Sequence, residues 1–182
     1  MYHVSSAPQA MVSQEMITRA LLDLMGSNVF REITVTQICQ EAQVTRQTFY
    51  RNYMTKEEVL ERYLVRMWMD LNKKYVKAPE DMESNIRNLF IHFPIPKNVL
   101  SLLDRSGMFY IVEKTCLDTS EILSKTMPFT HLMGQPEYDK YNIGFVASTV
   151  SCVLRIWTEN GFRETPEELG SITLSFFAGH KG

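Results

Sequence analysis

Apolar residues recur along the chain at spacings of three and four, the period of an amphipathic α-helix. In the first such segment, residues 13–25, they lie on one side of the predicted helix, and Gly26 with Asn28 marks its end. Alternating β-branched runs bounded by turn residues, which would predict strands, hardly occur. The pattern therefore predicts an all-α protein.

Two short helices follow. Thr34 and Gln37 have the spacing of a capping box, which predicts a helix that ends near Ala42. After a connection of three residues, a second helix is predicted over residues 46–53. A short helix, a tight turn and another short helix make a helix-turn-helix arrangement.

The remaining chain is predicted to be helical with short loops. Thr55 and Glu58 form a second capping box, which starts a long helix that reaches about residue 77, and Thr165 with Glu168 forms a third. Further helices are predicted near residues 80–93, 97–105, 108–127, 137–160 and 166–178.

Charge is distributed unevenly. The 182 residues have a formal net charge of −2, which excludes a uniformly basic surface. Residues 1–78 carry a small excess of basic residues, and residues 79–182 carry an excess of acidic ones. Between Ala42 and Lys56 the charged residues are all basic, namely Arg46, Arg51 and Lys56. This local patch favours a phosphate-bearing partner.

Several classes of protein are disfavoured by the sequence. The three cysteines, Cys39, Cys116 and Cys152, are too far apart for a metal knuckle or a disulfide framework. No motif for a hydrolase, a metalloprotease or a phosphate-binding loop occurs, so we expect no enzyme, cofactor or metal. No apolar stretch reaches the roughly 20 residues of a membrane span. We expect a cytoplasmic protein.

The stretch from Ile33 to Leu60 resembles the DNA-binding domain of the TetR family of bacterial transcriptional regulators. The matching residues are Thr34, Ile38, Ala42, Val44, Thr45, Thr48, Phe49, Tyr50, Tyr53, Lys56 and Glu57. The family usually has Gly in the turn where this chain has Gln43. A non-Gly residue in the left-handed conformation costs about 1 kcal/mol, which the motif can tolerate.

Side-chain chemistry assigns roles in binding double-stranded operator DNA. Arg46, Gln47 and Thr48 lie in the first turn of the recognition helix and are expected to read bases in the major groove. Donors suited to phosphate oxygens are expected at Thr36, Thr45, Tyr50, Arg51, Asn52 and Lys56.

The predicted helix over residues 137–160 is apolar on nearly all sides. One stripe includes Ala147 and Leu154. One side of such a helix can face its own domain, and another side needs a partner. A second stripe contains Phe145, Thr149, Cys152 and Ile156. The resemblance implies a homodimer through the last two helices, and the expected interface residues are Gly144, Ser148, Ser151, Ile172 and Phe176.

The expected organisation is a flexible arm (1–12), a helix-turn-helix domain (13–54), a connecting helix (55–78) and a helical regulatory and dimerisation domain (79–182). An effector pocket in the last domain would be lined by Phe90, Phe109, Tyr110 and Cys116. The resemblance implies a homodimeric repressor on a pseudo-palindromic operator, controlled by a small molecule. The alternative is a TetR-like dimeric coregulator or interaction scaffold without its own ligand.

Overall fold

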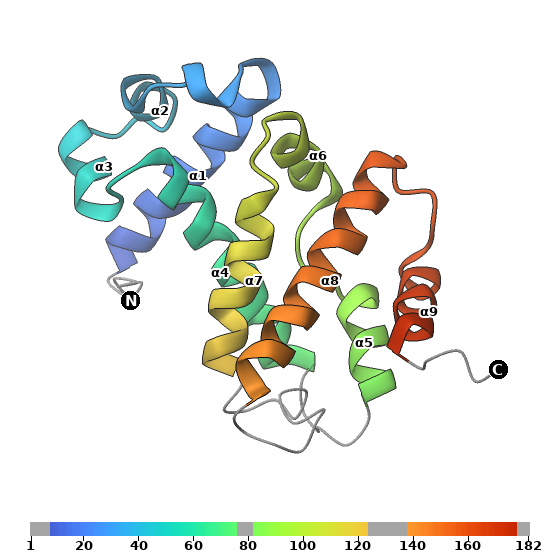
Figure 1. Ribbon diagram of the computed structural model, residues 1–182. Helices are drawn as coiled ribbons and strands as arrows, with labels where there is room; N and C mark the ends of the chain where they lie inside the picture. Colours follow the sequence, from blue (N-terminus) through green and yellow to red (C-terminus); the bar gives the residue numbers. More distant parts are fainter. Residues whose placement is uncertain (1–7, 76–81, 124–137, 178–182) are drawn as a thin grey trace.

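The computed structural model describes residues 8–75, 82–123 and 138–177, and it contains no strand within those ranges (Figure 1). Its elements are α1 (Pro8–Ser27), the 3₁₀ turn η1 (Phe30–Glu32), α2 (Val35–Glu41), α3 (Arg46–Asn52), α4 (Lys56–Tyr75), α5 (Met82–Ile91), α6 (Lys97–Arg105), α7 (Tyr110–Leu123), α8 (Asp139–Glu159) and α9 (Pro166–Phe177). The predicted all-α class and the helix-turn-helix are confirmed.

Helix α1 begins earlier than its apolar pattern predicts. Pro8 is its first residue, a position where the missing N–H of proline costs nothing. Residues 8–12, which the sequence assigned to a flexible arm, therefore belong to the helix. Residues 1–7 lie outside the described residues.

Capping residues set several helix starts. The Thr34 box is complete: the Gln37 amide donates to Thr34 Oγ1 at 3.2 Å, and the Thr34 amide donates to Gln37 Oε1 at 2.8 Å. The Thr165 box is complete in the same way, with distances of 3.2 and 2.7 Å. At the start of α4 the Glu58 amide donates to Thr55 Oγ1, but the Glu58 carboxylate accepts instead from the Met54 amide.

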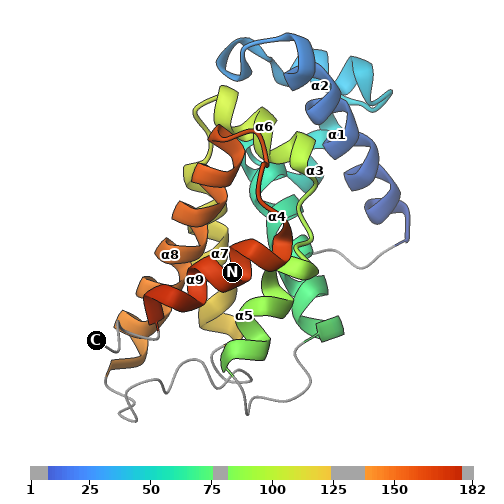
Figure 2. The same cartoon turned by 90° about the vertical axis from the view of Figure 1, so that its right-hand side faces the viewer.

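Helices α1 to α3 gather at one end of the molecule, together with the beginning of α4, and make up its front half (Figure 1). Helix α4 then leads into the rear half of the molecule, which consists of helices α5 to α9. There α7 packs against both α4 and α8. Helix α9 runs across α5, against which it packs (Figure 2). Within the described ranges, no helix has the length and apolar character that a membrane span needs.

One cluster of buried residues runs from α1 to α9. Helix α4 joins its two halves, since its buried residues extend from Val59 to Leu71. The Trp68 indole N–H donates to Thr115 Oγ1 of α7 at 3.3 Å, and its ring meets Phe93 edge to face at 5.6 Å between centroids. An ion pair of 2.8 Å between Glu61 and Lys114 adds a second link between α4 and α7.

We predict that Thr115→Val lowers the free energy of unfolding by about 1–3 kcal/mol, because it leaves a buried indole N–H without its acceptor. Valine nearly matches threonine in shape, so packing is preserved. Thr119→Val is the matched control: Thr119 is also buried and also donates to the carbonyl four residues earlier. Urea denaturation should show a clearly smaller loss for Thr119→Val, and equal losses would contradict the prediction.

Candidate nucleic-acid interface

The turn between α2 and α3 is closed by backbone bonds. Gln43 has a φ of 51°, so the predicted left-handed residue in place of Gly is confirmed. Beyond it, the Val44 amide donates to the Cys39 carbonyl at 3.0 Å. Thr45 then caps α3, because its hydroxyl accepts from the Thr48 amide at 3.1 Å. Local hydrogen bonds thus define where the recognition helix begins.

The outward face of α3 carries Arg46, Gln47, Tyr50 and Arg51, all of them exposed. The Arg46 guanidinium lies 5.9 Å from the centroid of the Tyr50 ring, at the outer limit of a cation–π contact. Thr36 is exposed in the first turn of α2. Donors for both bases and phosphates therefore stand on the surface of this small unit.

An open groove of about 560 Å³ lies between α1, the turn and α3. Its lining residues are Val12, Ser13, Gln43, Val44, Thr45, Thr48 and Arg51. The hydroxyls of Thr45 and Thr48 are 3.0 Å apart and hydrogen-bond to each other. Thr48 is half-buried, so it is less accessible than Arg46 and Gln47.

Asn52 does not fit the phosphate role that its amide suggested. It is 6% exposed, and its side chain is engaged inside the domain. The Asn52 Nδ2 donates to the Thr48 carbonyl at 2.8 Å, and Oδ1 accepts from Gln14 Nε2 at 3.2 Å. Since both ends of the amide are bonded within the protein, a DNA phosphate has no access to them.

Lys56 also has a different environment from the one expected. Its ammonium donates to the carbonyls of Phe30 at 2.6 Å, Arg31 at 3.1 Å and Ile33 at 2.7 Å. It also lies 4.5 Å from the centroid of the Phe30 ring. Three N–H donors meet three acceptors, so the ammonium fastens the start of α4 to η1 and has no donor left for a phosphate.

An anionic side chain holds the connection between α3 and α4. Burial would raise the pKa of Glu58, but the Met54 amide and the Arg62 guanidinium together hold it below its ordinary value. The Glu58 carboxylate accepts from the Met54 amide at 2.6 Å and pairs with Arg62 at 2.6 Å. The chain leaving the recognition helix is thereby tied to the first turns of α4.

In α8, the stripe of small residues that was expected at a dimer interface is covered by its own chain only in part. The Ser148 hydroxyl donates to Glu113 of α7 at 2.9 Å. Ser151 is buried within the chain. Gly144 belongs to the same stripe by its spacing, and open space lies where a Cβ would be. Ser151 therefore serves packing within the chain, whereas Ser148 is exposed and Gly144 has open space beside it.

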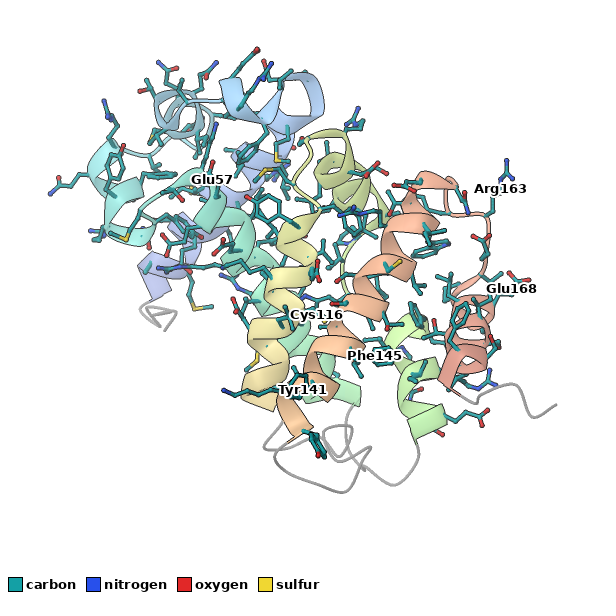
Figure 3. All side chains as sticks on the ribbon, in the orientation of Figure 1. Glu57, Cys116, Tyr141, Phe145, Arg163 and Glu168 are labelled. Carbon is teal, nitrogen blue, oxygen red and sulfur yellow. The ribbon has the colours of Figure 1, made fainter. Side chains whose placement is uncertain are left out.

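The second stripe of α8 is the one left uncovered. Phe145 is 60% exposed and Ile156 is 51% exposed, and Cys152 between them is exposed too. Figure 3 shows Phe145 on α8, one turn after Tyr141. On α9, the expected interface residues Ile172 and Phe176 are exposed. Exposed apolar residues therefore occur on both α8 and α9.

The four residues expected to line an effector pocket are not alike in their surroundings. Phe90, Phe109 and Cys116 are buried in the continuous core, whereas Tyr110 is exposed. The Arg155 guanidinium lies 5.3 Å from the centroid of the Phe109 ring. Packing accounts for the three buried side chains.

Gln14 is a residue that the sequence analysis missed. It is 2% exposed, donates to Asn52 and accepts from Arg66 at 3.3 Å. A signal was present, because Gln14 precedes Ile17 by three residues and Leu21 by seven, on the buried side of α1. A polar residue in an apolar stripe needs a partner inside the protein.

We predict that Lys56→Met lowers the free energy of unfolding by about 1–3 kcal/mol, since three carbonyls lose a charged donor. The control is Lys74→Met, an exposed residue in the last turn of the same helix, which should change stability by less than about 0.5 kcal/mol. Chemical denaturation of both variants tests this. A loss no greater than the control's would show that the carbonyls do not depend on Lys56.

Part of this chain is similar in sequence to a known protein. No family model matches the chain. It is 40% identical over 52 residues to the HTH-type dhaKLM operon transcriptional activator DhaS of Lactococcus lactis subsp. lactis (strain IL1403), a stretch that spans 29% of this chain and 28% of that activator.

Two solved structures are also similar. A dihydroxyacetone kinase operon activator DhaS superimposes with a TM-score of 0.51 at 19% identity, over 92% of this chain and 95% of that one. A gamma-butyrolactone receptor (ArpA like protein) gives a TM-score of 0.42 at 15% identity, over 92% and 87%. The two DhaS proteins are named as activators and the third protein as a receptor. The chain shares the all-helical fold of the DhaS structure.

Proposed function

We propose that this chain is a TetR-like transcriptional regulator that binds double-stranded DNA. The observation that carries the proposal is the outward face of α3, where Arg46 and Gln47 are exposed in the first turn of a helix capped by Thr45. Arg pairs with guanine and Gln with adenine through two hydrogen bonds each, so such a pair can read bases in the major groove. The 40% identity to an HTH-type activator over 52 residues supports it.

Phosphate contacts are assigned to the remaining exposed donors. Arg51 and Thr45 line the groove beside α3, and Tyr50 and Thr36 are exposed near it. Such contacts would position the protein on the duplex without reading its sequence. Thr48, half-buried at the groove, would make an apolar contact with a thymine methyl group through its own methyl.

A homodimer is the proposed functional unit. The exposed apolar residues of α8 and α9, Phe145, Ile156, Ile172 and Phe176, would be covered by the same face of a second copy. Two-fold symmetry presents two recognition helices, which suits a pseudo-palindromic operator with half-sites about 34–36 Å apart. Residues 13–54 then act as the DNA-binding part and residues 79–182 as the dimerising and regulatory part.

Repression is the proposed effect on transcription. A dimer that covers a promoter blocks transcription and needs no further contact surface to do so. The DhaS relatives carry the name of activators, so a reporter gene placed behind the bound sequence is the discriminating experiment. Reporter output that rises with the protein would overturn repression and leave DNA binding intact. Control by a small-molecule effector would appear as a change in DNA affinity when the effector binds.

We predict that Arg46→Ala costs about 1–3 kcal/mol in binding and relaxes base preference at one position of the operator. Arg51→Ala should instead weaken binding to all sequences alike. Selection from a random duplex library followed by fluorescence anisotropy measures both. Arg163→Ala, an exposed arginine between α8 and α9 and far from α3, is the control (Figure 3). If the wild-type protein selects no sequence from the library, the proposal of a DNA-binding regulator fails. An interaction scaffold is then the proposed function instead.

We predict that Phe145→Arg and Phe176→Arg each produce a folded monomer, because an unpaired charge would be buried at the interface. Sedimentation velocity measures the oligomeric state, and far-UV circular dichroism checks that the helices are retained. Met54→Arg is the control, since Met54 is an exposed apolar residue of the front half. A dimer that survives both α8 and α9 substitutions would refute this interface.

A further inference from the structure

The C-terminal end of the recognition helix is buried, although its outward face is exposed. Helix α3 has seven residues, and its last residue, Asn52, is 6% exposed. Tyr53, which follows it, is 2% exposed. A helix of two turns has little stability of its own, so its orientation depends on what holds its ends.

Gln14 links this end of α3 to two long helices. Its Nε2 donates to Asn52 Oδ1 at 3.2 Å, and its Oε1 accepts from the Arg66 guanidinium at 3.3 Å. Asn52 Nδ2 in turn donates to the Thr48 carbonyl at 2.8 Å. Side chains of α1, α3 and α4 are thereby joined in one chain of hydrogen bonds, called the positioning bridge here: Gln14, Asn52 and Arg66.

A second set of side chains around the end of α3 lies one helical turn from the bridge on each long helix. These are Thr18, four residues after Gln14 in α1, and Arg62, four residues before Arg66 in α4. Burial raises the pKa of Tyr53, and the neighbouring Thr18 side chain of α1 opposes that rise. The Arg62 guanidinium of α4 stands 5.3 Å from the centroid of the Tyr53 ring and is held by Glu58. The same two helices therefore contact two consecutive residues at the end of α3.

Apolar packing alone would leave the rotation of α3 loosely defined. Phe49 anchors the helix in the core, but hydrophobic contacts are not directional, and small rotations of α3 change the buried apolar area little. Hydrogen bonds to buried amides are directional, and an unmet amide in this place is costly. The bridge therefore selects one rotation of α3, which sets the direction in which Arg46 and Gln47 project.

We propose that Gln14, Asn52 and Arg66 are positioning residues for sequence-specific DNA recognition, although the bridge itself touches no DNA. This inference rests on the proposed function. It implies that loss of the bridge weakens binding to the specific site more than binding to random DNA, because phosphate contacts tolerate small misorientations better than bidentate base contacts.

The test compares affinities for the selected operator and for random duplex DNA, measured by fluorescence anisotropy with the full chain. Gln14→Met keeps the size of the side chain and removes both of its hydrogen bonds. We expect the ratio of specific to random affinity to fall roughly five- to tenfold. Ile38→Val is the control, since it loosens the same domain from a fully buried position without touching the bridge. Its ratio should stay at the wild-type value.

A double-mutant cycle separates the bridge from general destabilisation. Asn52→Leu should lower the ratio as Gln14→Met does, and the double variant should lower it by much less than the product of the two single losses, since both remove the Gln14–Asn52 bond and each removes one further bond of its own. Losses that multiply in the double variant would overturn the proposal. So would an unchanged ratio for Gln14→Met, or an equal fall for Ile38→Val.

Gln14→Glu provides a second test if the Met variant fails to fold. It keeps the shape and the acceptor for Arg66, but a carboxylate cannot donate to Asn52 Oδ1. Its added charge lowers affinity for all DNA, and the ratio cancels that effect. The ratio should fall as for Gln14→Met, and a ratio equal to that of wild type would overturn the inference. Wild-type protein that binds no preferred sequence would count against the proposed function instead.

Discussion

Helix α4 connects the front half to the rear half. The two halves keep a fixed relative position only if α4 is fastened to both. Its start is fastened by the Lys56 ammonium to three carbonyls around η1. Further along, Trp68 donates to Thr115, and Glu61 pairs with Lys114. A 20-residue helix spans about 30 Å and bends little, so these polar anchors, with the apolar core that surrounds them, set the geometry of everything attached to α4.

The parts of the fold that the sequence predicted well depend on interactions between neighbours in the chain. The capping box of Thr34 and Gln37 closes within three residues, and so does that of Thr165 and Glu168. The bounds of α6, residues 97–105, match the prediction because Pro96 and Gly107 flank the helix. The left-handed Gln43 was expected on a different ground, the resemblance to a family that usually has Gly at this place in the turn.

The site was harder to predict, because a side chain's donor chemistry does not reveal which partner it meets. Lys56 and Asn52 carry groups that suit phosphate, yet their partners in the fold lie 23 to 26 and 38 residues away. Ser148 was placed at an interface by spacing alone, and its partner Glu113 is 35 residues distant. Residues that the fold leaves accessible, such as Arg46 and Gln47 of α3 and Phe176 of α9, keep the roles first given to them as proposals.

If the chain binds DNA as proposed, specific recognition would depend on buried residues as well as exposed ones. On the proposed function, the outward side chains of α3 would determine which bases can be read, but a helix of two turns cannot hold its own direction against thermal motion. Directional bonds at its buried end supply that constraint, at the cost of placing amides in the core, where each must find its partner. A change at Gln14 can therefore alter recognition without altering any group that meets DNA. Base preference would accordingly depend on two layers, the residues that contact DNA and the residues that orient them.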